Sequence, residues 1–94
     1  MFQIKHAEIL KDAQGVQTGV KVVFESGQEI AIGFDEIPAN ITSASAKAQW
    51  VKEQLMEQLV VGHRPDGSPI RHYKVNVVAV SEDPFAIAWS WEAL

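Results

Sequence analysis

Along residues 2–34 the hydrophobic positions alternate with polar ones, a pattern typical of β-strands that are buried on one face. Two short polar segments, each with a glycine, interrupt the alternation and predict turns. The alternation begins at Phe2 and changes parity near residues 6–8, which predicts a β-bulge there. This part of the chain is therefore expected to form a meander of three antiparallel strands.

The second of these hairpins fixes the pairing of its two strands. The sequence at 25–27 matches a three-residue loop in which Gly27 takes a positive φ. That loop places Val22 opposite Ile30 and directs the large side chains of both strands to one face. A two-residue turn would pair Val22 with Ala31 instead.

From about Ser43 to Val61 the hydrophobic residues recur at the spacing of one face of an α-helix. Ser43 and its hydroxyl neighbours are candidate N-caps, and Gly62 is expected just beyond the C-terminal end. The predicted hydrophobic stripe consists of Ala44, Ala48, Val51, Leu55 and Leu59.

Two further strands are predicted after the helix, at about 71–81 and 85–94, because both segments are rich in β-branched or aromatic residues. The expected order is βββαββ, a single α+β domain over residues 1–94 with one antiparallel sheet of about five strands. A helix of about eighteen residues is about 27 Å long, enough to cover one face of such a sheet and not both.

The face of the sheet away from the helix is expected to carry small apolar residues. An antiparallel sheet with one solvated face normally shows polar residues there, whereas valines fall on this one. Trp50 lies on the side of the helix opposite the hydrophobic stripe, where it either faces solvent or packs under a loop. Contiguous exposed apolar residues mark interfaces, although scattered ones are ordinary surface. The predicted interface residues are Val23, Trp50, Val78 and Val80.

Composition excludes several classes of function. The formal net charge of −4 argues against nucleic acid as a partner. The chain has no cysteine, which excludes disulfides, thiolate zinc sites and a cysteine nucleophile. No apolar run approaches the roughly 18 residues of a membrane span, so the protein is expected in the cytoplasm and away from membranes.

The stretch GHRPDGSPIRH at 62–72 concentrates the candidate chemistry. Its Pro-Asp-Gly sequence is typical of a turn, and Pro69 is expected to keep the segment from continuing as a strand, which favours a solvated loop. No close pairing of histidines is present, so no metal site is assigned. The alternative is a ligand site in which five polar side chains converge on one pocket: His63, Arg64, Asp66, Arg71 and His72.

These patterns favour a small, non-enzymatic binding or assembly module that self-associates, most simply as a two-fold dimer, and presents a surface to a protein partner. No catalytic residue and no cofactor is assigned. The alternative function is that of a small enzyme or anion-binding protein with its site around residues 62–74.

Overall fold

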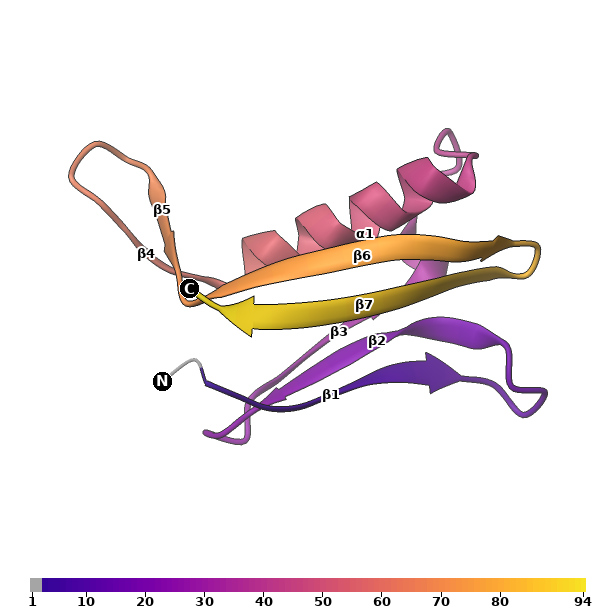
Figure 1. Ribbon diagram of the computed structural model, residues 1–94, viewed down its shortest axis with the longest axis horizontal. Coiled ribbons are helices and arrows are strands. Elements are labelled where there is room, and N and C mark those ends of the chain that lie inside the picture. Colours follow the sequence, from indigo (N-terminus) through magenta and orange to yellow (C-terminus); the bar gives the residue numbers. More distant parts are fainter. Residues whose placement is uncertain (1–2) are drawn as a thin grey trace.

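The computed structural model describes residues 3–94 and has the predicted α+β architecture (Figure 1). Phe2, with which the predicted first strand begins, lies outside the described residues. The elements in chain order are β1 (Ile4–Lys11), β2 (Gln17–Phe24), β3 (Glu29–Gly33), the 3-10 helix η1 (Phe34–Glu36), α1 (Ala44–Gln58), β4 (Val60–His63), β5 (Pro69–Arg71), β6 (Tyr73–Glu82) and β7 (Phe85–Ala93). The strands form three small antiparallel sheets: β1-β2-β3, β4-β5 and β6-β7.

The three-stranded sheet has the register that its turn sequence predicts. Val22 pairs with Ile30, and Gly27 has a φ of 89°. The register of β1 shifts between Ile4 and His6, slightly ahead of the predicted bulge at 6–8. The shift brings both Ile4 and the later apolar residues of β1 into packing with the core.

Three hairpins turn in the same way because a glycine ends each turn. Gly15, Gly27 and Gly67 have φ values of 82°, 89° and 90°, a region that residues with a Cβ rarely adopt. Each of these glycines donates its backbone N–H to the carbonyl oxygen three residues earlier, at 2.9–3.0 Å. The repeated geometry shows that the turn depends on the position of the glycine and little on the residues before it.

The third of these turns belongs to the β4–β5 hairpin, where a loop was expected. The expectation that Pro69 keeps the segment from continuing as a strand was wrong, since Pro69 begins β5 and pairs with His63. A proline has no N–H to donate, so it is tolerated in a strand that has no partner on its other side. Residues 62–72 therefore form a short two-stranded ribbon with one register shift.

Helix α1 begins where the sequence predicts and ends earlier. The Ser43 side chain accepts a hydrogen bond from the Ala46 N–H at 3.2 Å and caps the N-terminus. All five residues of the predicted stripe are buried. The helix ends at Gln58 because Val60 already pairs with β5, so Gly62 lies in β4 and is not a helix cap.

The core lies between the three-stranded sheet, the β6–β7 hairpin and α1, and Figure 1 shows α1 running along β6. The helix packs on β-structure as predicted, but the strands do not form one continuous layer. The buried hydrophobic residues come from all three parts: Val20, Val22, Phe24, Ile32, Ala44, Ala48, Val51, Leu55, Leu59, Val75 and Ile87.

Side chains, and not a strand ladder, join the hairpin to the sheet. The Gln17 side chain donates to the Ile87 carbonyl at 3.1 Å and accepts from the Ile87 N–H at 2.8 Å. The Tyr73 hydroxyl accepts from the Ile4 N–H at 3.1 Å. Within residues 3–94, no helix is long and apolar enough to cross a membrane.

Candidate functional site

The turn of the β4–β5 hairpin uses two of the predicted ligand residues for its own structure. Arg64 donates from Nη1 to the Pro69 carbonyl at 2.9 Å and to the Ser68 hydroxyl at 3.3 Å. One carboxylate oxygen of Asp66 accepts from the Ser68 hydroxyl at 2.7 Å and from its N–H at 2.9 Å. These bonds, the hydroxyl bond first, lower the pKa of Asp66 below its ordinary value of 3.8.

Arg71 is directed away from this turn and toward the helix. Its Nε donates to the Met56 carbonyl at 2.7 Å, one of the last carbonyls of α1. The last turn of α1 has no basic residue of its own, so Arg71 supplies the positive charge that favours a helix C-terminus. Arg71 thus has a structural role at the end of α1.

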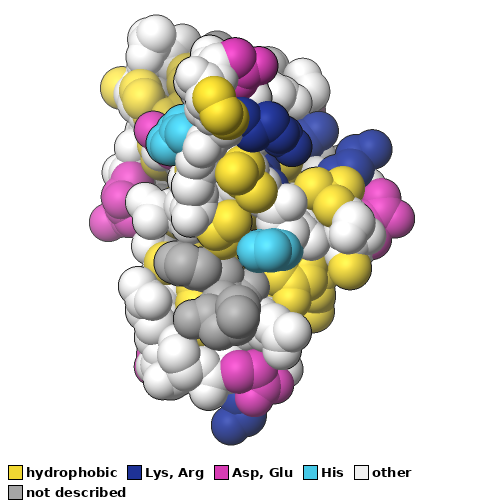
Figure 2. All heavy atoms as spheres, turned by 90° about the vertical axis from the view of Figure 1, so that its left-hand side faces the viewer, with side chains coloured by type: hydrophobic (Ala, Val, Ile, Leu, Met, Phe, Trp, Pro, Cys, Tyr) yellow, Lys and Arg dark blue, Asp and Glu magenta, His cyan; other side chains and the backbone are white. Residues whose placement is uncertain are grey.

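The two histidines of the segment, His63 and His72, are exposed. Figure 2 views the molecule from the side on which the β4–β5 hairpin projects, and histidine side chains do not gather into a cluster on this face. Within the described part of the chain, no three His, Asp or Glu side chains are placed to hold a metal ion. Of the five predicted ligand residues, the structure brings only Arg64 and Asp66 together, through their shared contact with Ser68.

The four predicted interface residues lie in three different places. Val78 and Val80 are 58% and 61% exposed on the outer face of the β6–β7 hairpin. Val23 is half-buried on the outer face of the other sheet. Trp50 is also half-buried and packs against the core, which favours packing over exposure to solvent.

The outer face of the β6–β7 hairpin is hollowed. Val78 pairs with Ala88 across the two strands, and the small alanine leaves a depression beside the valine. The hollow has a volume of about 300 Å³ and is lined by Asn76, Val78, Ala88, Trp89 and Ser90. Sequence reasoning placed the valines on an outer face but gave no sign of this depression, because it depends on which residues pair across the strands.

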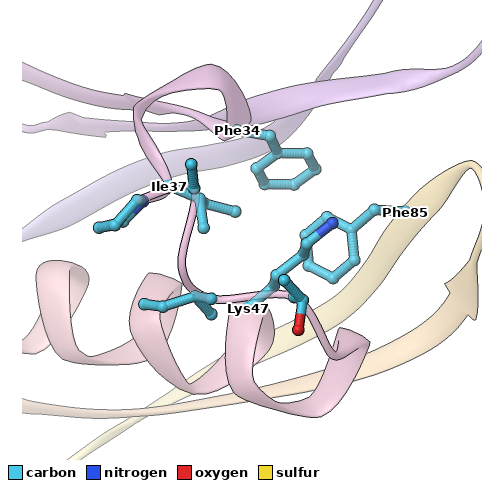
Figure 3. Close-up of a pocket in the computed structure, with 8 residues that line it drawn as sticks. Phe34, Ile37, Lys47 and Phe85 are labelled. Carbon is cyan, nitrogen blue, oxygen red and sulfur yellow. The ribbon is translucent and has the colours of Figure 1, made fainter.

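A second hollow, of about 310 Å³, lies between η1, the loop that follows it, the first turn of α1 and the start of β7 (Figure 3). The Phe34 and Phe85 rings meet edge to face at a centroid distance of 5.0 Å. The Lys47 ammonium lies 5.5 Å from the centre of the Phe85 ring. The hollow is lined by Phe34, Ile37, Pro38, Ala39, Ile41, Thr42, Lys47 and Phe85.

Sequence reasoning missed this second hollow entirely. No site role was assigned to Phe34, Phe85 or Lys47 from the sequence. Only the fold brings them together. Comparison of the chain with protein-family models, with curated proteins and with solved structures finds no match.

Proposed function

We propose that this protein is a small binding or assembly module that self-associates through the outer face of the β6–β7 hairpin. The exposure of Val78 and Val80 carries this proposal. Single exposed valines are common on protein surfaces. These two, however, stand two residues apart on one strand face, and Ala88 continues the apolar surface onto the neighbouring strand.

A second copy of the chain fits this face for two reasons. First, the face carries both projecting valines and a hollow, so a two-fold axis can place the projection of one copy against the hollow of the other. Second, Asn76 and Ser90, which flank the valines, carry no charge that would oppose its own copy. The only charged pair in register with this surface, Lys74 and Glu92, has opposite signs.

The size of the face sets the expected strength of association. Strand β6 has ten residues. At about 3.3 Å per residue and about 4.8 Å between strands, the hairpin presents a face of about 300 Å². Stable interfaces bury about 800 Å² on each partner. A dimer through this face alone is therefore weak and reversible. Trp91, although 39% exposed, pairs with the buried Val75 and so lies on the opposite face of the hairpin.

The alternative site at residues 62–74 receives less support. Arg64 and Asp66 already bond within their own turn, and Arg71 bonds to α1. A ligand would have to displace these contacts before it could use the same donors and acceptors.

The proposal is tested by sedimentation velocity over a concentration range of about 10 to about 500 µM, where weak dimers form. Two matched variants place a lysine on an exposed alanine of each sheet: Ala88→Lys on the hairpin and Ala31→Lys on the three-stranded sheet. The wild type and Ala31→Lys are expected to associate as concentration rises. Ala88→Lys is expected to weaken association at least about ten-fold, because like charges would face each other across the two-fold axis.

Two outcomes contradict the proposal. One is a wild-type protein that sediments as a monomer over the whole range. The other is an Ala88→Lys variant that associates as strongly as the wild type.

A further inference from the structure

The hollow beside Phe85 has walls that suit an apolar group. Its volume of about 310 Å³ is at the lower end of the range for small-molecule sites, about 300–1,000 Å³. In Figure 3 the Phe34 and Phe85 rings and the Ile37 side chain lie around it; Phe34 and Ile37 belong to η1 and its C-cap, and Phe85 begins β7. The hollow therefore has room for a small ligand and not for one the size of a dinucleotide.

Lys47 and Thr42 supply the only charged group and the only hydroxyl of this lining. The ammonium of Lys47 is held over the Phe85 ring, a favourable contact for a cation. Among residues 3–94, neither the Lys47 ammonium nor the Thr42 hydroxyl has a carboxylate or hydrogen-bond partner. A concave site with aromatic and aliphatic walls and a few placed polar groups is the usual form of a ligand site.

Across residues 3–94, the acidic residues of η1 form no ion pair with Lys47. The Glu36 carboxylate accepts from the Gly33 N–H at 2.7 Å. The Asp35 carboxylate lies against Gly33, where a Cβ would otherwise stand. Neither residue lines the hollow, and neither does Asp83, which is exposed near Phe85. The first turn of α1 also lacks an acidic residue, so its N-terminal dipole adds to the positive potential here.

We propose that this hollow binds a small carboxylate with an apolar body. The apolar part packs between Phe34, Ile37 and Phe85, and the carboxylate accepts hydrogen bonds from Lys47 and Thr42. An uncharged apolar ligand would leave both polar groups without a partner, and an organic cation would be repelled by Lys47. A phosphate group is favoured less because the lining has a single cation and no arginine. This site is separate from the outer face of β6–β7 and does not depend on self-association.

The proposal is tested by titrating the ¹⁵N-labelled protein with hexanoate and following its amide resonances by NMR. Hexanol and hexylamine are the matched probes, because they keep the six carbons and replace the carboxylate with a neutral hydroxyl or a cationic ammonium group. Hexanoate is expected to shift the amides of Phe34, Ile37, Lys47 and Phe85 in a saturable manner. Its affinity should exceed that of hexanol about five-fold, the gain expected for one partly exposed charge-assisted contact.

Two variants test whether Lys47 and Thr42 cause the preference for hexanoate. Lys47→Met keeps the apolar stem over Phe85 but removes the charge, and it should bind hexanoate and hexanol equally well. Thr42→Val keeps the shape of the side chain and should lower the affinity for hexanoate alone. Lys52→Met, on the same helix and outside the lining, is the control and should behave as the wild type.

The proposal is overturned if hexanoate produces no saturable shifts, or if hexylamine binds as tightly as hexanoate. It is also overturned if Lys47→Met retains the preference for hexanoate over hexanol.

Discussion

The outer faces of the two larger sheets expose different chemistry although both consist of antiparallel strands. On the three-stranded sheet, Lys21 forms an ion pair with Glu29 at 2.9 Å and His6 contacts Glu8 at 3.4 Å. On the β6–β7 hairpin, one charged pair, Lys74 with Glu92, lies near the end of the outer face, and the central positions are valine, alanine, asparagine and serine. The first face is suited to water, since charged pairs surround its one valine. The outer face of the β6–β7 hairpin is therefore the part of the predicted apolar surface that stays exposed to solvent in the folded protein.

The two sheets also differ in how they are held. Strands β1, β2 and β3 are joined by backbone ladders, with register shifts in β1, whereas the hairpin is joined to them by the side chains of Gln17 and Tyr73 and by packing in the shared core. Among the described residues, 3–94, no backbone ladder connects the hairpin to the three-stranded sheet. Substitutions inside the three-stranded sheet, at the attachment of the hairpin and on the charged outer face test this contrast.

The largest effect is expected from Gly19→Ala in the middle of the three-stranded sheet. A Cβ at Gly19 would collide with the backbone carbonyl oxygen of Ile32, so β2 and β3 would have to separate. We expect a loss of about 3 kcal/mol in the free energy of unfolding, measured with urea. Gly62→Ala is the control, because the space beside Gly62 is open and its φ is not positive; it should change stability by less than about 0.5 kcal/mol. Equal losses in both variants would show that the sheet is not tightly closed at Gly19.

A smaller loss is expected from Gln17→Leu, which detaches one end of the hairpin. The substitution keeps the size of the side chain but leaves the N–H and carbonyl of the buried residue Ile87 without partners. We expect destabilisation of about 2 kcal/mol and faster hydrogen exchange at the Ile87 amide. Gln14→Leu, in an exposed turn, is the matched control. An unchanged rate of hydrogen exchange at the Ile87 amide would show that the Gln17 side chain does not hold the hairpin to the sheet.

The smallest effect is expected from Glu29→Gln on the charged outer face. The hydrogen bond that the Lys21 ammonium donates to Glu29, and then the negative charge of Glu29, raise the pKa of Lys21 above the ordinary value of 10.5. A raised pKa stabilises the folded state below the pKa of the unfolded chain, and this contribution disappears as the pH rises through the folded value. Urea unfolding between about pH 9 and about pH 12 should therefore show a loss of stability that is smaller in Glu29→Gln, where only Glu8 still raises the pKa of Lys21. Glu25→Gln, in the neighbouring turn, should retain that loss.

Local features were predictable from the sequence because each depends on residues close together in the chain. The buried stripe of α1 follows from helical spacing, and the pairing of Val22 with Ile30 follows from the position of Gly27. The β4–β5 hairpin has the same turn but was missed, since the local preference of Pro69 was given more weight than its place at a sheet edge. The glycine at the end of the turn was the signal that could have found it.

The candidate sites were predicted only in part. Alternation placed Val23, Val78 and Val80 on outer faces, but parity does not say which strands share a sheet, and Val23 belongs to a different one. The helical wheel placed Trp50 opposite the stripe. It is nevertheless half-buried, because the core reaches α1 from both the hairpin and the three-stranded sheet.

The sequence by itself determined the helix, the glycine turns, the strand register of β2 with β3 and the apolar character of β6. The tertiary structure decided the division into three sheets, the use of Arg71 at the end of α1 and the hollow between Lys47 and Phe85. The difference follows from how far apart in the sequence the interacting residues of each feature lie. Spacing and turn chemistry act over a few residues, whereas the contact of Gln17 with Ile87 joins positions 70 residues apart and exists only once the chain has folded.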